Sequence, residues 1–494
     1  MIDCHMFPRR FGEKMKMPNL TGMNGSMANE SMSIHQHVAN ASVFPFFDWR
    51  FMFYLIHPSE IPETEDVKQI PSYTNQVIPV FILMLLIELA AKYYHTGSGF
   101  RINDTVTSIG AGLASQTIKF ITRSLDVIVY IWIYDNCRLW TIPLRSWTGW
   151  ILALLAADLA YYWLHRMNHE VSILWASHQT HHSSEEYNLS TALRQSMIGG
   201  IYNWIVYLPM AFFGFTPVAY VVHAQLNLLY QFWIHTAMIK SCGIFESFLN
   251  TPSHHRVHHG RNPYCIDKNY AGVLIIWDKM FGTFEPEHPD EEVVYGILSP
   301  VSSFNGVWVQ TCYYFDAVSR LATFPNLRDK INSLIMGPGW SPGTQRLGNP
   351  EHIPAIQHPV KVYDVQIAPW KSAYVIVHFV LLILFFHHTA ERFEGWSHTQ
   401  VWLASLGLMA SLGNLGSLLD DKAWVPYGEF VRCLDVLFFS RVFDFELSNL
   451  TASLITWIFA FSAGVWWFVV FGRMVLQQTK HRPKSQANKA RKTR

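Results

Sequence analysis

The apolar positions of the chain fall into long runs rather than alternating with polar residues. The first convincing run is Val77–Ala91, and Lys92, Tyr93 and Tyr94 follow it. An apolar run that ends in basic and aromatic residues predicts a helix crossing a membrane. Glu88 lies inside the run, and we expect it to face protein or a cavity rather than lipid.

The next two apolar stretches differ in how cleanly they predict a span. Residues 105–134 carry Lys119, Arg123 and Asp126 near their middle, so they predict either one long helix or two short re-entrant ones. Trp147–Leu164 predicts a membrane helix whose last turn is an aromatic belt. This helix continues directly into the first of the histidine pairs described below.

Two further runs predict an apolar hairpin. Ile198–Phe215 and Val218–Ile234 are joined around Thr216 and Pro217. Such a hairpin either crosses the membrane twice or dips into it and returns. In both cases the chain ends on the side where it began.

The C-terminal part of the chain, from about residue 285, consists of a polar region followed by separate apolar runs. A polar region of about 285–370 precedes three predicted spans, Ser372–Phe386, Val401–Leu419 and Ala452–Val475. Residues 430–445 contain two arginines and two aspartates, so we expect an interfacial segment there. The tail from Lys480 to Arg494 has seven Lys or Arg and no acid, which favours the cytosolic side.

Composition supports the membrane interpretation. Half of the 494 residues are hydrophobic and only 15% are charged, whereas soluble domains average about 25% charged. The net charge is +1, and no basic block interleaved with aromatic residues indicates nucleic-acid binding. The six cysteines include no C-x-x-C pair, so neither a disulfide framework nor a thiolate metal site is indicated.

We therefore expect an all-α fold, a polytopic bundle of membrane helices with a histidine-rich site for two metal ions at the cytosolic membrane surface. The expected organisation is a polar N-terminal extension (1–43), N-terminal membrane segments (44–144), a metal-binding domain (145–290), a soluble linker (291–370), C-terminal membrane helices (371–476) and a basic tail (477–494).

Eight histidines fall into three groups with helical spacing. Box one is His165 and His169, box two is His178, His181 and His182, and box three is His255, His258 and His259. Residues three and four apart share a helix face, so each box is expected to aim its imidazoles in one direction. Because the hairpin returns to its starting side, all three boxes are expected on one membrane face.

Eight imidazoles exceed what one zinc ion takes and suit two metal ions, and imidazole serves iron, copper, zinc and nickel alike. His235 ends the hairpin at the membrane surface and is a ninth candidate ligand. A lone histidine there is about as often an interfacial residue. His254 adjoins box three but breaks its spacing, which favours a role beside the ligands rather than as one of them.

These boxes resemble the pattern of the fatty acid hydroxylase/sterol desaturase superfamily, which consists of integral membrane di-iron oxygenases. Asn188, Thr191 and Arg194 resemble its N-x-x-T-x-x-R motif, and the run from Asn269 to Thr283 resembles its closing N-Y-x-G…W-D…F-G-T segment. The resemblance covers roughly residues 145–290. It implies that the eight box histidines hold two iron ions, and related hydroxylases supply additional histidines from the region of His235, the ninth candidate ligand.

One departure points to a branch of the superfamily. Many members follow the arginine with His-Pro-x-Glu, whereas Arg194 is followed here by Gln195, Ser196 and Met197. The flanks of boxes one and two resemble a branch that cleaves the ether bond of alkylglycerols. This resemblance alone implies molecular oxygen, tetrahydrobiopterin, an ether lipid substrate and the endoplasmic reticulum membrane, with a multi-pass topology.

Two acidic residues are candidates beside the metal ligands. Glu170 follows box one and would point about 100° away from His169 on a helix. It could orient a ligand, take a proton or bind the pterin, and the resemblance favours a catalytic role over a solvated surface acid. Asp278 beside Trp277 is either such an acid or a turn residue.

Two other interpretations stay open at this point. One is a fatty acid, sphingolipid or sterol hydroxylase fed by cytochrome b5 as a separate partner, since no H-P-G-G haem motif occurs in the chain. The other is a metal transporter, which would place its histidines along a path near the membrane midplane. The clustering of polar residues beside the boxes disfavours a transporter.

Overall fold

The structure is a computed structural model that describes residues 48–122, 125–442 and 445–481, with side chains up to residue 476. Within these ranges the chain is helical and forms no strand, only two isolated bridges. The expected extension 1–43 and most of the basic tail lie outside the described residues.

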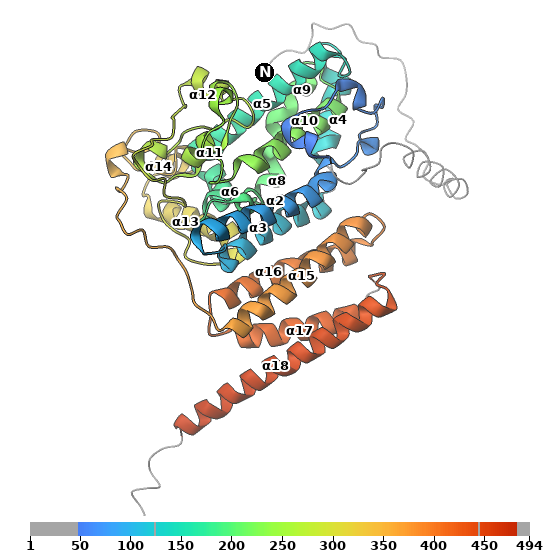
Figure 1. Ribbon diagram of the computed structural model, residues 1–494, viewed down its shortest axis with the longest axis vertical. Coiled ribbons are helices and arrows are strands. Elements are labelled where there is room, and N and C mark those ends of the chain that lie inside the picture. The colour runs from blue at the N-terminus through green and yellow to red at the C-terminus, as the bar shows by residue number, and fades with distance from the viewer. Residues whose placement is uncertain (1–47, 123–124, 443–444, 482–494) are drawn as a thin grey trace, which may run out of the picture. The chain divides into compact units, whose positions relative to one another are not determined.

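Two sets of helices form most of the described part of the chain (Figure 1). Those that surround the histidine boxes are α2 (Tyr73–Thr96), α3 (Ile102–Thr122), α4 (Leu125–Cys137), α5 (Trp147–Glu170), α6 (Ser172–His182), α10 (Pro217–Ile234), α11 (Pro252–His259), α12 (Ile276–Phe281), α13 (Gly306–Thr323) and α14 (Leu327–Ile335). The C-terminal set is α15 (Pro369–Arg392), α16 (His398–Leu419), α17 (Val425–Val442) and α18 (Asn449–His481).

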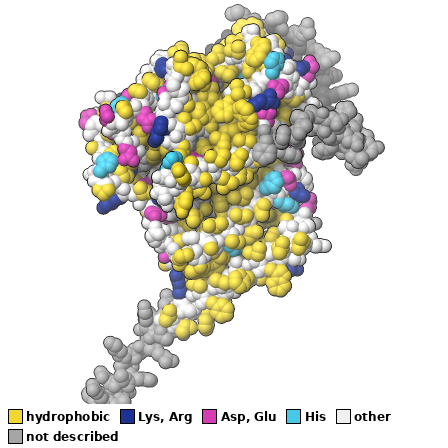
Figure 2. Space-filling view, in the orientation of Figure 1, with side chains coloured by type: hydrophobic (Ala, Val, Ile, Leu, Met, Phe, Trp, Pro, Cys, Tyr) yellow, Lys and Arg dark blue, Asp and Glu magenta, His cyan; other side chains and the backbone are white. Residues whose placement is uncertain are grey.

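Four helical stretches among the described residues are long and apolar enough to cross a membrane. They are Val67–Thr96, Pro369–Arg392, His398–Leu419 and Asn449–Leu476. Each contains one of the predicted runs, and Figure 2 shows hydrophobic side chains over the outer face of the C-terminal helices. The chain is accordingly a multi-pass membrane protein built from helices.

The structure bears on three predictions about the spans. Trp147–Leu164 does form a helix, α5, but α5 is not one of the four apolar stretches, which corrects its prediction as a span. For residues 105–134, two helices, α3 and α4, are found rather than one long helix, as the second of the two alternatives expected. Ile198–Phe215 is broken into α8 (Gly199–Tyr202), a 3-10 turn (Asn203–Tyr207) and α9 (Leu208–Phe212), each too short to cross a membrane. The hairpin was expected either to cross the membrane twice or to dip into it and return. Because the first half of the hairpin is broken into short helices, only the second alternative fits.

Helix α3 separates the two sets of helices. Its apolar side chains Ala114 and Phe120 pack with Phe379 and Leu412 of the C-terminal set. Its polar side turns to box two, where Ser115 donates a hydrogen bond to the carbonyl of Ser196. Helix α3 therefore packs its apolar face against the C-terminal set and hydrogen-bonds to the other set through its polar face.

The four C-terminal helices run antiparallel to one another. At one end, Lys371 pairs with Asp421 and Arg473 donates to the carbonyl of Ala423. At the other end, Arg392 of α15 pairs with Glu446, which precedes α18. The prediction of an interfacial segment at 430–445 is corrected for the residues up to Val442. These residues belong to α17, which packs between α16 and α18.

Candidate metal centre

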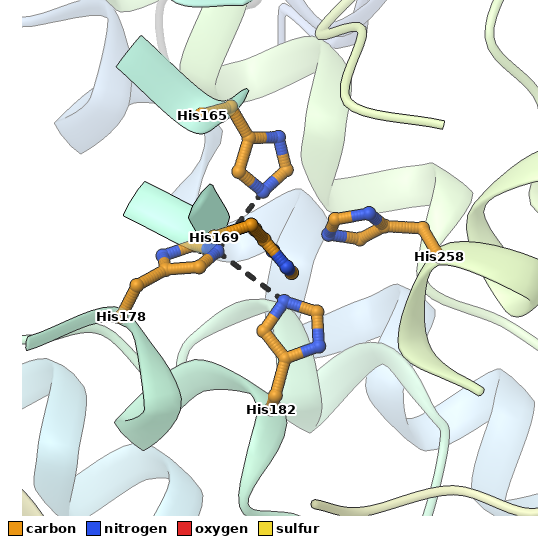
Figure 3. Close-up of side chains that lie close together, drawn as sticks. All are labelled: His165, His169, His178, His182 and His258. Atoms are coloured by element: carbon orange, nitrogen blue, oxygen red, sulfur yellow. Dashed lines mark hydrogen bonds between the residues drawn. The ribbon is translucent and has the colours of Figure 1, made fainter. Parts of the chain in front are cut away.

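Five of the predicted histidines form a first cluster, shown in Figure 3. One ring nitrogen from each lies within 4.8 Å of one ring nitrogen from every other. Box one contributes from the last turns of α5, box two from α6 and box three from α11. The members are His165, His169, His178, His182 and His258.

Four more histidines form a second cluster that meets the same criterion. His181, His255 and His259 come from boxes two and three, and His235 comes from the end of α10. The rings of His182 and His259 are only 4.4 Å apart, so the two clusters are neighbours. All nine predicted ligand positions are thus brought together, including His235.

Boxes two and three are each divided between the clusters, which corrects the expectation that each box faces one way. His178 and His182 join the first cluster, and His181 joins the second. In box three, His255 and His259 share a cluster, and His258 lies in the other. Adjacent helical residues point about 100° apart, so a pair spaced by four serves one site while the residue between them serves the other.

Backbone carbonyls fix the ring orientation of several histidines. The Nδ1 atoms of His165, His181, His235 and His258 donate to the carbonyls of Tyr270, Arg194, Gln231 and Lys268, at distances of 2.7, 3.0, 2.6 and 2.9 Å. A carbonyl can only accept, so in each of these rings Nδ1 carries the proton and Nε2 presents a lone pair. Such outer hydrogen bonds are typical of histidines that bind metal.

The Nε2 atoms face one another at short range. In the first cluster, Nε2 of His178 lies 3.0 Å from that of His165 and 3.3 Å from that of His182. In the second, the steps from His181 to His235 to His255 to His259 are 3.2, 3.0 and 3.2 Å. Nitrogens bound to one ion at about 2.1 Å would be about 3.0–3.4 Å apart.

Other ring nitrogens of the clusters have no hydrogen-bond partner within the described part of the chain. His169 Nε2 and His258 Nε2 are buried and form no hydrogen bond with the described residues. Burial lowers the pKa of every clustered histidine, to about 4 for His181. The rings are therefore neutral at physiological pH and free to bind a cation, so the donor set fits a metal ion in each cluster.

The Asn269–Thr283 segment holds the first cluster in place. The Asp278 carboxylate accepts hydrogen bonds from the amides of Tyr270 and Ala271, both at 2.8 Å, and from the Thr283 hydroxyl. Tyr270 in turn presents its carbonyl to His165. Asp278 therefore fixes the loop that orients a ligand, which favours the turn role among the two alternatives.

Close packing explains why this loop has a glycine at position 272. A Cβ at this position would lie 2.7 Å from Asn227 Oδ1 and 2.9 Å from Asp158 Oδ1. Asp158 of α5 accepts from the amides of Val273 and Leu274 and from the Trp277 indole. Asp158 was missed by the sequence analysis, where its only signal is that it is an acid within an apolar helix.

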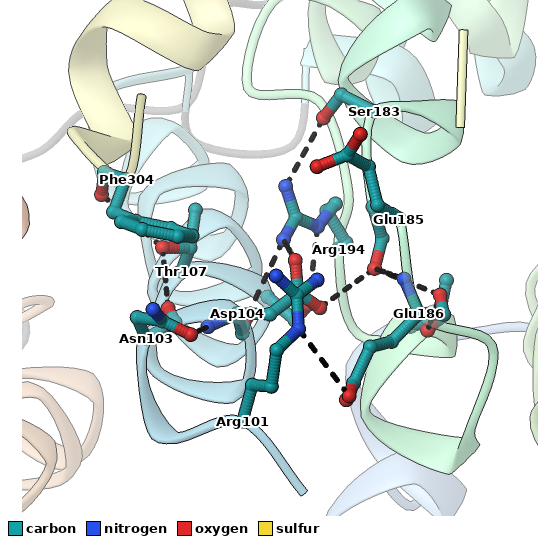
Figure 4. Close-up of polar contacts among 12 residues, drawn as sticks. Arg101, Asn103, Asp104, Thr107, Ser183, Glu185, Glu186, Arg194 and Phe304 are labelled. Carbon is teal, nitrogen blue, oxygen red and sulfur yellow. Dashed lines mark hydrogen bonds and ion pairs between the residues drawn. The ribbon is translucent and has the colours of Figure 1, made fainter. Parts of the chain in front are cut away.

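The flank of box two is held by a buried arginine (Figure 4). Asn188 caps α7 (Leu189–Ala192) together with Thr191. The Arg194 guanidinium pairs with Asp104 of α3 at 2.7 Å and donates to Ser108 and Ser183. Its backbone carbonyl receives the His181 proton, so the N-x-x-T-x-x-R motif positions a ligand of the second cluster.

Glu170 is buried but lies outside both clusters. One carboxylate oxygen accepts from Arg166 Nε at 2.7 Å, and the other accepts from Arg346 Nη1 at 2.9 Å. Burial and the nearby Glu170 charge raise the pKa of Asp267 to about 7, and Asp267 lies 3.6 Å from His169 Nδ1. The contacts of Glu170 suit a positioning role, and a catalytic role for it stays a prediction.

His254 belongs to neither cluster. Its Nδ1 lies 3.4 Å from the Thr251 hydroxyl, and its ring packs edge-on against Phe284. Its backbone carbonyl accepts from Asn269 Nδ2, which links α11 to the loop that orients His165. This agrees with its expected place beside the ligands.

A cavity of about 250 Å³ reaches both clusters. His165 and His178 of the first cluster and His181 of the second form part of its wall. The rest is lined by aromatic and amide side chains, among them Tyr207, Gln195, Asn203, Asn227 and Gln231. The sequence analysis missed the amides of α10, although Asn227, Gln231 and His235 are spaced by four along an apolar helix, which indicates one polar stripe.

Two parts of the chain match known families. Residues 150–283, which contain every clustered histidine, match the Fatty acid hydroxylase family. Residues 371–458 match the family described as Alkylglycerol monooxygenase C-terminal domain. No solved structure matches the chain.

Curated relatives resemble the chain over most of its length. Alkylglycerol monooxygenase of Xenopus tropicalis is 44% identical over 393 residues, which is 79% of this chain and 87% of the relative. The Homo sapiens protein of the same name is also 44% identical, over 80% of this chain and 88% of its own length. Lathosterol oxidase of Rattus norvegicus is 26% identical over 35% of this chain and 62% of its own length.

Proposed function

The chain belongs to the alkylglycerol monooxygenase family, and from this premise we propose that it cleaves 1-alkylglycerols with tetrahydrobiopterin as reductant. One atom of O₂ enters the ether carbon as a hydroxyl group, and the other leaves as water with two electrons from the pterin. The resulting hemiacetal breaks down to a fatty aldehyde and glycerol. The observation that carries this proposal is the pair of neighbouring histidine clusters on the wall of one cavity.

The family and the clusters together indicate a non-haem iron site. We propose two iron ions, one held by the five histidines of the first cluster and one by the four of the second. Bound iron would supply the oxidising power that a C–H bond requires and that side chains cannot provide. The chain's own contribution is to keep nine imidazoles neutral, oriented and shielded from water.

The cavity suits a substrate with a long apolar part. Leu164 and Tyr207 line it, and so does Leu228, which is 42% exposed at the surface of α10. Ile201 and Ile205, on the adjoining short helices, are also exposed. We propose that the alkyl chain enters between these side chains from the lipid, which places the ether carbon beside the clusters.

Tetrahydrobiopterin and the role of Glu170 are part of the same proposal. Glu170 joins the end of α5, which carries box one, to Arg346 of the linker. We propose that this pairing positions the surface against which the pterin reacts. Truncating Glu170 should then lower activity while the iron content is kept, because neither carboxylate oxygen is a candidate ligand.

The competing interpretations have less support. Nine histidines in two buried clusters lie outside all four candidate spans, whereas a metal transporter would line a path within the spans. A hydroxylase fed by cytochrome b5 would also fit the superfamily, but the superfamily relatives named Lathosterol oxidase match a smaller share of the chain.

We also propose that the protein resides in the endoplasmic reticulum membrane, with the histidine clusters at its cytosolic face.

Assay of the full chain in microsomes tests this function. A 1-alkylglycerol should yield fatty aldehyde only with oxygen and added tetrahydrobiopterin, and NADH with cytochrome b5 should not replace the pterin. The matched ester should not be oxidised, because its corresponding carbon is a carbonyl without hydrogen. Hydroxylation of a fatty acid or sterol under NADH, with the ether untouched, would overturn the proposal.

A further inference from the structure

The segment that follows α10 and the helix α12 expose a group of large apolar side chains. The segment comprises a loop and a 3-10 turn, η5 (Gly243–Ser247). Ile244 is 80% exposed and Met280 is 67% exposed. We call the group the η5–α12 patch, and its members are Met238, Ile239, Ile244, Phe245, Phe248, Met280 and Phe281.

Hydrogen bonds join the two parts of the patch into one surface. Lys279 Nζ of α12 donates to the carbonyls of Glu246 and Ser247, at 3.3 and 2.7 Å. The amide of Ile275 donates to the carbonyl of Phe248 at 3.1 Å. A single exposed apolar side chain is ordinary on a protein surface, whereas a contiguous group of this kind indicates an interaction site.

The base of the patch is fixed by a buried arginine. Arg256 directly follows His255 of box three, and its guanidinium donates to the carbonyls of Ile239 and Lys240, at 2.7 and 2.9 Å. The same guanidinium pairs with Glu287 at 2.6 Å. These bonds hold the apolar side chains outward, although their exposure to water is unfavourable. The arrangement therefore suits an apolar partner, and it is tied to the helix that carries box three.

The exposed apolar side of α5 leads into the patch. The ring of Phe281 lies 5.1 Å from that of Trp163, which is itself exposed. Ile151 and Leu152 are exposed as well, and helical spacing places them within about 120° of Trp163 around α5. Trp163 comes two residues before His165, so the patch lies at the cluster end of α5. Aromatic side chains at the end of an apolar helix face are typical of a membrane interface.

The charges on the patch fit an anionic surface. Lys240 and Lys279 are both exposed within it. Glu246 is the one acid in residues 238–248, and its partly buried carboxylate accepts two hydrogen bonds from its surroundings. Residues 279–282 contain no acid. Such a surface binds anionic lipid, because its apolar groups enter the headgroup boundary while its ammonium groups meet the lipid charges.

We propose that the η5–α12 patch inserts into the headgroup region of an anionic membrane surface and so holds the histidine clusters against the bilayer. Because the chain is a multi-pass membrane protein, lipid is the apolar partner that is always within reach. None of the four candidate spans among the described residues lies within 145–290, so the patch gives the part that carries the clusters an anchor of its own. This inference does not depend on the reaction that the clusters catalyse.

Photocrosslinking of the purified full chain in lipid vesicles tests the contact. The photoreactive amino acid p-benzoylphenylalanine is placed at position 244 or 280 of the patch, at position 457 on the exposed side of α18, or at position 290 in an exposed polar loop. The vesicles contain phosphatidylcholine with phosphatidylserine as the minor component, and mass spectrometry identifies the adducts after irradiation. Positions 244, 280 and 457 should form lipid adducts, whereas position 290 should form about tenfold fewer.

The share of phosphatidylserine among the adducts tests the charge. At position 244 this share should exceed the share of phosphatidylserine in the vesicle at least about fivefold, because each lysine near the surface favours anionic lipid. Lys240→Gln should lower that enrichment about fivefold while adducts still form. Lys68→Gln, at an exposed position in η3 (Val67–Gln69), is the matched control and should leave the enrichment unchanged.

Three results would overturn the inference. The first is the absence of lipid adducts at positions 244 and 280 in preparations that form them at position 457, which would place the patch in water. The second is a crosslink from position 244 to another protein in microsomes, or to a second copy of the chain in vesicles, in place of lipid. The third is lipid adducts at position 244 without enrichment of phosphatidylserine, which would contradict the anionic partner. Wild-type metal content and elution would show that each variant is folded.

Discussion

At the scale of single residues, helical spacing was enough to identify the histidines but not their division. His178, His181 and His182 were predicted to face one site, yet the ring of His181 meets His235 and His259 instead. The spacing contains this information, because adjacent residues diverge by about 100°. What the sequence could not supply was the position of α10, which brings His235 into the second cluster.

His235 and His254 offer a paired test of the second cluster. His235→Ala removes a member of the cluster, so we expect the protein to lose about half its iron and at least a hundredfold in activity. His254→Ala removes a neighbour whose ring contacts Thr251 and Phe284, and it should keep its iron. Metal analysis and turnover of the two purified variants would check this, and equal iron in both would exclude His235 as a ligand.

At the scale of elements, the apolar runs predicted the long outer helices and failed where polar groups are paired inside. α17 contains Glu429 and Arg432, and both are buried. Glu429 accepts from Tyr374 of α15 and Asn414 of α16, and Arg432 donates to His378 of α15. A hydropathy pattern counts these charges as interfacial because it contains no information about their partners.

This polar group gives a prediction about stability. Arg432→Leu leaves the Glu429 carboxylate buried without its cation, so we expect a loss on the order of 3–5 kcal/mol. Replacing both residues with apolar ones of similar volume should cost less than the single change. Thermal unfolding in detergent would measure both, with the exposed Arg328→Leu of α14 as control. A single variant as stable as that control would show that the ion pair does not stabilise the bundle.

At the scale of the whole molecule, the site depends on segments that are distant in sequence. Asp420, at the end of α16, accepts from the amide of Phe304, and the carbonyl of Phe304 accepts from Thr107 of α3. Gln179 of box two donates to the carbonyl of Val309 in α13. The long-range contacts that link the C-terminal helices to box two cannot be deduced from periodicity, whereas the eight box histidines and the four spans could be.

The antiparallel order of α15–α18 predicts the topology. The start of α15 and the later part of α18 lie at the end where Asp420 meets Phe304. We therefore expect a tag at residue 300 and a tag after residue 494 on the same, cytosolic, side. Protease treatment of sealed microsomes should remove both tags. Protection of the tag at 300 alone would contradict the shared face.

The central claim is that nine histidines divide into two neighbouring iron sites. Elemental analysis of the purified full chain, with turnover of the alkylglycerol measured on the same preparation, tests it most directly. We predict iron approaching two equivalents per chain, with activity rising as the second equivalent is bound. One zinc ion without iron, or full activity at a single iron, would contradict the account.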